Sequence, residues 1–267
     1  MTHTRAHLKV RAKALLIGNS GKAVALLLIP GLFSLLLKGG GLFTAASGSL
    51  YGSLSPFFTS SAWQYAAPAI LLILSGLSLI ILTPVLLGRD AWFWERSARE
   101  YRPFTYAFSW YKKMGRAIAL YLIRWGIRLC SGLFFLFPAA AFTLASLLLY
   151  IRGCPLYTLV ILAGTSAALW IFGAVYTTLF LQRFFLVPYL IAGTPELRVC
   201  DAFRKSSQIM DSCMMRGNTA KMKLSFFPWF LSCILVLPVL YVYPYYKQAC
   251  ACYARHILNY EKTPDFL

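Results

Sequence analysis

The chain has 267 residues, of which 59% are hydrophobic and only 13% are charged, whereas a soluble domain usually carries about a quarter of its residues charged. This composition excludes an ordinary water-soluble fold. Lys and Arg number 26 against 8 Asp and Glu, a net charge of +18. No basic-aromatic RNA-binding motif accompanies that charge, so nucleic acid is not expected as a partner.

Several uncharged apolar runs reach the ~20 residues that a helix needs to cross a bilayer. The sequence therefore predicts an all-α, polytopic transmembrane helical bundle in the cell membrane. Basic residues of membrane proteins collect in cytosolic segments, which accounts for the net charge. We expect amphipathic helices at the membrane interface on the same side.

Residues 1–22 begin the chain as a basic cytosolic segment. Its apolar residues Leu8, Ala12, Leu15 and Leu16 recur at helical spacing, which predicts an amphipathic helix at the interface. The first span follows at 23–37. A cleaved signal peptide is the alternative interpretation, and it is disfavoured because the basic region is too long and further spans follow.

The second predicted span is 66–87, reached through an uncharged Gly- and Ser-rich stretch at 39–64 that is typical of a flexible outer loop. Residues 88–116 then mix Arg, Lys, Trp and Tyr. This mixture is typical of the membrane–water boundary, because aromatic rings bridge apolar and polar layers.

Two arginines, Arg124 and Arg128, interrupt the apolar run 118–137. Residues 129–149 are uncharged and long enough to cross the membrane alone, so this range is the predicted third span. Arg116, Arg124 and Arg128 then lie at the interface beside Trp125, with their side chains reaching lipid phosphates. The alternative is a buried functional arginine pair, which would need acidic partners.

The fourth predicted span, 156–181, leads into a cytosolic segment at 182–223. Thr194, Pro195 and Glu196 form a typical helix start, with a cap, a proline and an acid at the positive end of the helix dipole. We expect an amphipathic helix from Pro195 to Cys213. Its basic face carries Arg204 and Lys205.

The C-terminal portion has two interpretations. It is either one span, 224–242, or a hairpin of two spans, 224–237 and 241–258, that turns near Pro238. In both cases a tail follows at 261–267.

The distribution of basic residues predicts the orientation. Segments 1–22, 88–116 and 182–223 hold five, seven and seven Lys or Arg residues, 19 of the 26, while the two predicted outer loops hold only Lys38 and Arg152. The positive-inside rule therefore predicts that these three segments and the N-terminus are cytosolic.

Five stretches together resemble the bacterial integral membrane family called domain of unknown function 975. They are RAKALLIGNSGKA, RFFLVPYLIAGTPEL, AFRKSSQIM, KLSFFPWFL and YVYPYYKQACACYARHI. The residues that carry the family pattern are Pro195, Ala202, Lys205, Ser206, Met210, Ser225, Phe226, Trp229, Pro244 and Tyr245. The chain departs from the pattern at Gly193 and Thr194, where an acidic residue is expected, and at Pro228, where glycine is usual.

The resemblance implies six membrane helices with both termini cytosolic, which favours the hairpin interpretation. It implies no activity, because the family is defined without one.

No catalytic residue, metal site or cofactor is predicted. Phosphate-binding loops and zinc-protease motifs are missing. Cys250 and Cys252 form a single C-x-C motif, and no second cysteine pair is present to complete a zinc site. None of the eight acidic residues falls in a predicted span, which disfavours a cation-coupled transporter.

The sequence thus favours a non-enzymatic membrane scaffold or accessory subunit. Its expected partners are anionic headgroups, with a protein partner or oligomer on the same face. The alternative is a permease component for an anionic or lipidic solute.

Overall fold

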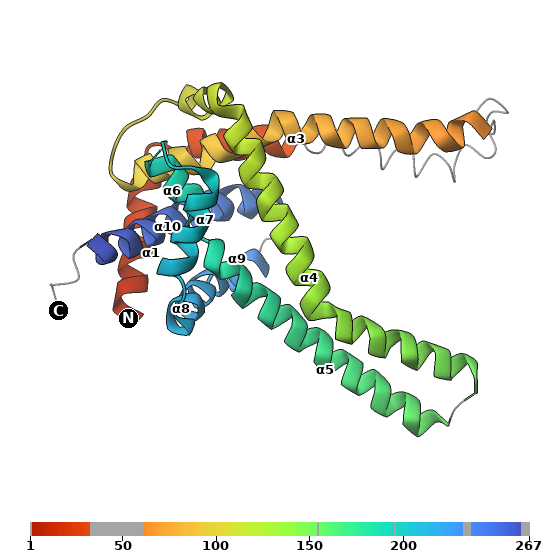
Figure 1. Ribbon diagram of the computed structural model, residues 1–267. Coiled ribbons are helices and arrows are strands. Elements are labelled where there is room, and N and C mark those ends of the chain that lie inside the picture. Colours follow the sequence, from red (N-terminus) through yellow and green to blue (C-terminus); the bar gives the residue numbers. More distant parts are fainter. Residues whose placement is uncertain (1, 33–60, 154, 195, 232–235, 263–267) are drawn as a thin grey trace. The chain divides into compact units, whose positions relative to one another are not determined.

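The computed structural model describes residues 2–32, 61–153, 155–194, 196–231 and 236–262. These residues form helices joined by turns, with no strand among them, as the ribbon in Figure 1 shows. The predicted all-α class is therefore confirmed for this part of the chain.

Two stretches are long and apolar enough to cross a membrane, Phe104–Ile151 and Tyr157–Gly193. A third candidate is the pair of helices Ala6–Leu16 and Ser20–Leu32, which are bent by 92° at a short break. Within the residues described, the structure thus holds two to three candidate spans. The larger number of six stays a prediction.

The contacts divide the chain into two compact units. The first, here called the terminal unit, comprises Met1–Ala119, Ala192–Pro195 and Pro228–Leu267. The second, here called the hairpin unit, comprises Leu120–Ile191 and Glu196–Phe227.

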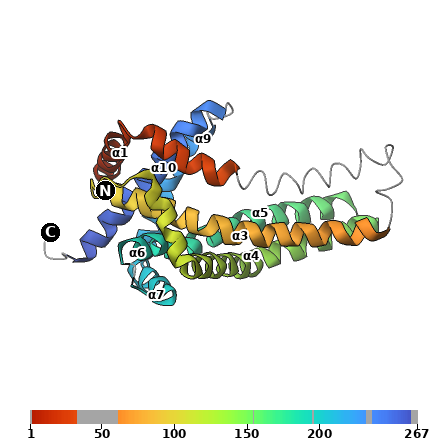
Figure 2. The same cartoon turned by 90° about the horizontal axis from the view of Figure 1, so that it is seen from above.

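The terminal unit is built around α10 (Val236–Lys262), which packs against α1 (Thr2–Leu16) and α3 (Ser61–Ser97). Figures 1 and 2 both show α10 beside α1. Small side chains on α10 allow the close approach of the helix backbones. The buried small residues are Ala249, Cys250, Ala251, Cys252 and Ala254.

The apolar face predicted for the N-terminal helix exists, and protein covers it. Leu8, Ala12 and Leu16 are buried, with exposed fractions of 5%, 0% and 6%, on a helix that contacts α10 and α3. The spacing therefore identified the correct face of α1. These contacts bury the face inside the protein, whereas the sequence predicted that it lies at the lipid interface.

The predicted second span, 66–87, lies inside α3, which continues without a break to Ser97. The first residues of the charged segment 88–116 therefore belong to the same helix as the predicted span. A short 3-10 helix, η3 (Phe104–Lys113), packs back on α3. A side chain at Gly88 would overlap the backbone of Ala107, so glycine is what permits this contact.

Arginine side chains join the ends of α1, α3 and α10. Arg11 donates to the carbonyl of Ser97 at 3.2 Å, and Arg96 donates to the carbonyl of Leu15 at 3.2 Å. Arg255 of α10 donates to the carbonyl of Trp94 at 2.9 Å, in the last turn of α3. Carbonyls in the last turn of a helix have no partner within that helix, so these arginines supply the missing donors.

The hairpin unit contains two long apolar helices, α4 (Met114–Ile151, from Leu120 onward) and α5 (Leu156–Leu181). Figure 1 shows the second half of α4 running beside α5. A side chain at Gly173 would meet the carbonyl of Phe135, so glycine allows the two backbones to approach closely. The third and fourth predicted spans, 129–149 and 156–181, are thus confirmed as helical segments.

Four shorter helices follow α5 along the chain. They are η4 (Gln182–Phe184), α6 (Val187–Gly193), α7 (Val199–Ile209) and α8 (Cys213–Leu224). Within the hairpin unit, α8 and η4 contact α5, and α7 contacts η4.

The expected single helix from Pro195 to Cys213 is wrong. Arg198 has an extended backbone and caps α7, which therefore begins only at Val199. The helix ends at Ile209, and Ser212 caps α8 by accepting a hydrogen bond from the Met215 backbone. A serine that satisfies a free backbone N–H favours a new helix start, so Cys213 belongs to α8.

The predicted helix 224–237 is interrupted near its start. Leu224 ends α8, a turn follows, and α9 is described over Phe227–Leu231. Pro238 itself lies in the first turn of α10, where proline is tolerated, and the expected hairpin turn near it stays a prediction. Segment 241–258 lies within α10, and residues 232–235 fall outside the described residues.

Candidate anionic-lipid site

A cavity of about 150 Å³ lies in the hairpin unit, where the two long helices meet the short ones. Its lining residues come from α4, α5, η4, α7 and α8 and the residue after η4. They are Arg124, Ile127, Arg128, Thr178, Leu181, Gln182, Phe184, Phe185, Phe203 and Lys223. The lining combines three cations with aromatic and aliphatic side chains, and it contains no carboxylate.

The two arginines reach the cavity because they lie four residues apart, one helical turn, on the same side of α4. Arg124 is half-buried and Arg128 is exposed. Among the residues that the structure describes, no ion pair involves either arginine. The predicted pair therefore shares one cavity, and no acidic side chain neutralises it there.

Lys223, near the end of α8, is held in a defined position. Its Nζ donates a hydrogen bond to Oε1 of Gln182 at 2.6 Å and lies 4.5 Å from the ring centroid of Phe185. Gln182 is buried, and its Nε2 donates to the carbonyl of Thr178 at 3.3 Å. The amide is therefore oriented with its oxygen toward the lysine.

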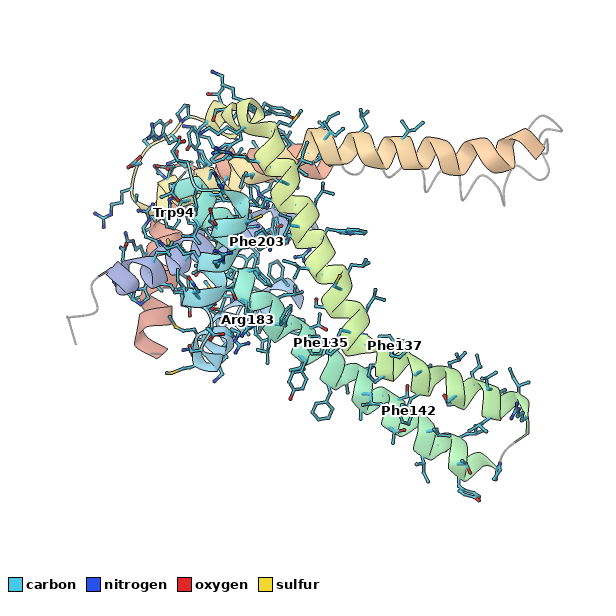
Figure 3. All side chains as sticks on the ribbon, in the orientation of Figure 1. Trp94, Phe135, Phe137, Phe142, Arg183 and Phe203 are labelled. Atoms are coloured by element: carbon cyan, nitrogen blue, oxygen red, sulfur yellow. The ribbon has the colours of Figure 1, made fainter. Side chains whose placement is uncertain are left out.

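The frame around the cavity rests on a second set of contacts. Arg183 forms an ion pair with Asp211 at 2.6 Å, which links η4 to the turn after α7. Ser206 of α7 donates to the carbonyl of Arg183 at 2.7 Å. Figure 3 labels Arg183 at the end of α5, with Phe135 and Phe137 further along the hairpin.

Three of the family-pattern residues in and directly after α7 are buried, whereas Lys205 on the same helix is exposed. Ala202, Ser206 and Met210 are fully buried. Of the remaining family-pattern residues, Pro244 is buried within α10 and Tyr245 is half-buried, whereas Trp229 is exposed. Pro195 lies outside the described residues.

The other residues predicted at the interface lie apart from the cavity. Arg204 and Lys205 are exposed on α7, Trp125 is exposed on α4, and Arg116 belongs to the terminal unit. Sequence reasoning did not single out Lys223, although it lies in a basic segment and follows Lys221 by two residues.

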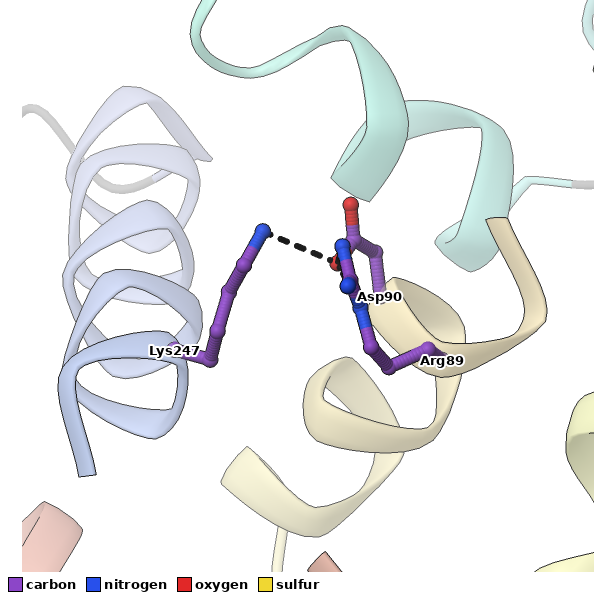
Figure 4. A network of polar contacts seen from close by, with 3 residues as sticks. All are labelled: Arg89, Asp90 and Lys247. Carbon is purple, nitrogen blue, oxygen red and sulfur yellow. Dashed lines mark hydrogen bonds and ion pairs between the residues drawn. The ribbon is translucent and has the colours of Figure 1, made fainter. Parts of the chain in front are cut away.

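The terminal unit buries charges of its own. Figure 4 shows Asp90 of α3 between two cations, with Arg89 at 3.1 Å and Lys247 of α10 at 3.3 Å from its Oδ1. Arg89 and Asp90 are both buried. This cluster joins two helices, and its cations are already engaged by Asp90, so it is a structural contact and not a second candidate site.

No protein-family model matches the chain, and no curated protein or solved structure matches it. The described part thus defines a helical protein with two to three helices apolar enough to span a membrane. Its resemblance to domain of unknown function 975 stays a prediction from the quoted stretches.

Proposed function

We propose that this protein is a non-catalytic, multi-pass integral membrane protein that acts as a scaffold or accessory subunit, and that its basic cytosolic face binds anionic lipid headgroups. The observation that carries the proposal is the junction in the hairpin unit, where exposed apolar helices end in a cationic cavity without a carboxylate.

The apolar part of the argument rests on α4 and α5. Large hydrophobic side chains point outward along both helices, among them Phe134, Phe137 and Ile171, which are 75%, 70% and 65% exposed. Exposed apolar area costs roughly 25 cal/mol per Å² in water. Hydrocarbon removes this cost, so a lipid environment explains why these faces need no protein cover.

The polar part rests on the cations near one end of the same unit. Arg124, Arg128 and Lys223 line the cavity, and α7 exposes Arg204 and Lys205. Anionic headgroups attract basic side chains near a membrane surface by about 1 kcal/mol per residue. An apolar hairpin with such a basic end matches one leaflet of a membrane, in which hydrocarbon chains are followed by charged headgroups.

The six spans and the cytosolic position of both termini belong to this proposal as well. Their support is the predominance of Lys and Arg in segments 1–22, 88–116 and 182–223, together with the family resemblance. Labelling of a cysteine introduced at the exposed Ser109 tests the orientation. In a background without native cysteines, we expect modification by a membrane-impermeant maleimide only after the cells are opened.

The lipid proposal is tested by reconstituting the full chain in nanodiscs with increasing fractions of phosphatidylglycerol in phosphatidylcholine. We expect the thermal midpoint of unfolding to rise with the anionic fraction and this rise to shrink at high salt, because salt screens headgroup charges. Equal midpoints in neutral and anionic discs would contradict the proposal.

A permease component for an anionic or lipidic solute is the second candidate. The cavity favours it because three cations and an oriented amide suit a passing anion. In a cell with a solute-dependent phenotype, loss of the phenotype in a stably inserted Arg124→Gln variant would favour transport over the scaffold. Retention of the phenotype would favour the scaffold.

A further inference from the structure

We infer that the cavity between α4, α5, η4, α7 and α8 is a stoichiometric site for one phosphate group of an anionic lipid, a more specific claim that rests on the proposed lipid-binding function. Arg124, Arg128 and Lys223 supply the positive charge. The apolar lining receives the carbon atoms next to the phosphate.

Charge is the first argument. Three cations converge on a small volume whose lining has no carboxylate, so each raises the electrostatic free energy of the others. A phosphate oxygen placed among them relieves this repulsion. Arginine also presents its donors in a planar fork that matches two oxygens of one phosphate, and two such forks lie one turn apart on α4.

Size is the second argument. Pockets that bury drug-sized ligands usually enclose about 300–1,000 Å³. A cavity of about 150 Å³ is much smaller and suits a single phosphate group with a few adjoining atoms. The remainder of a lipid would lie outside it, and Ile127 and Leu181 in the lining belong to the same helices that expose apolar side chains.

Order is the third argument. The lysine is held by the 2.6 Å hydrogen bond to Gln182 and by the ring of Phe185, while Gln182 is held by the carbonyl of Thr178. A donor fixed in this way loses little conformational freedom when it binds an anion. This separates the cavity from the exposed Arg204 and Lys205, which attract any negative surface.

The test uses the full chain in a neutral detergent with four probes: dioctanoyl phosphatidic acid, dioctanoyl phosphatidylglycerol, dioctanoyl phosphatidylcholine and inorganic phosphate. Native mass spectrometry counts bound molecules, and thermal unfolding titrations give the dissociation constants. We expect saturable binding of one molecule of each anionic lipid. Phosphatidylcholine should bind at least tenfold more weakly, because its choline offsets the phosphate charge.

Lys223→Gln and Lys221→Gln are the matched variants. Both remove one positive charge from α8, but Lys221 is exposed and does not line the cavity. We expect Lys223→Gln to weaken the binding of phosphatidic acid at least tenfold and Lys221→Gln to change it less than about twofold. Arg128→Gln is the second cavity variant, since it leaves the Lys223–Gln182 hydrogen bond in place.

The outcomes separate this inference from the proposed function. If both cavity variants bind phosphatidic acid like Lys221→Gln while anionic nanodiscs still stabilise the protein, the site is overturned and the general lipid function stands. If anionic lipid has no effect at all, both fail. Inorganic phosphate that competes at equal affinity would support the phosphate site and identify a free anion as its occupant, which overturns the lipid assignment.

Discussion

Lys247 on α10 lies 3.3 Å from the carboxylate of Asp90 on α3, a contact between residues 157 positions apart in the chain. Arg89 shares the same oxygen at 3.1 Å. One carboxylate therefore holds two cations in a largely buried environment.

We predict that Asp90→Asn destabilises the protein by roughly 3–5 kcal/mol, because removing one partner leaves buried charge uncompensated. Denaturant unfolding of the full chain in detergent measures the change. Glu100→Gln is the control, since its pair with Arg102 is exposed and worth about 0–1 kcal/mol. Equal losses in the two variants would show that the buried carboxylate has no special role.

Gly88→Ala is expected to destabilise the terminal unit by about 1–3 kcal/mol, the usual cost of overpacking, because the new methyl group meets the backbone of Ala107. Gly76→Ala in the same helix has open space around it and gains up to about 1 kcal/mol of helix propensity. Thermal unfolding of both variants should give opposite signs. A neutral Gly88→Ala would mean that η3 moves freely away from α3.

The hairpin unit offers a test of polar contacts between apolar helices. The Thr143 hydroxyl on α4 lies 2.7 Å from that of Ser166 on α5 and accepts from the indole N–H of Trp170 at 3.1 Å. Thr143→Val keeps the shape and removes both contacts, so we expect a loss of about 0.6–1.7 kcal/mol.

Thr165→Val is the control for that loss, because the Thr165 hydroxyl donates to the carbonyl of Leu162 within its own helix. Its expected effect on the unfolding free energy is smaller. A Thr143→Val variant as stable as this control would indicate that Thr143 and Ser166 contribute nothing to the pairing of α4 and α5.

Glu95 gives a pH-dependent prediction. Burial, followed by the neighbouring Glu100 carboxyl, raises the pKa of Glu95 above its ordinary value of 4.5. An ionised Glu95 therefore disfavours the fold. The penalty is absent below the unfolded pKa, grows as the pH rises from there, and is complete above the folded pKa.

Glu95→Gln should consequently raise the thermal midpoint at neutral pH. Below about pH 4.5 its midpoint should match that of the parent protein, because Glu95 is then protonated in both the folded and the unfolded state. Melting curves of both proteins across this range measure the difference. A stabilisation of equal size at every pH would point to packing and not to ionisation.

The long helices were predictable because their causes are local. The predicted bounds 156–181 agree with α5. An uninterrupted apolar run follows Pro155, and proline is unfavourable inside a helix, so the helix begins after it. The break between α7 and α8 was missed because the apolar spacing continues through it. The backbone leaves the helical conformation at Met210, and Ser212 then caps a new helix.

The cavity was only half predictable. Arg124 and Arg128 stand out in an apolar run, and their spacing puts them on one side of a helix. Lys223 joins them through tertiary packing of α8 on α5, which no local pattern contains. In the same way, Lys247 lies in an aromatic segment, and its partner Asp90 comes from a distant part of the chain.

The contact between α1 and α10 joins the first and the last helix that the structure describes. Residues 17–235 are synthesised between α1 and α10, so the first helix leaves the ribosome long before its packing partner exists. The hairpin unit has its main elements close together in the chain and is complete earlier. During that interval the apolar face of α1, with Leu8, Ala12 and Leu16, lacks the cover that α10 gives it in the folded unit.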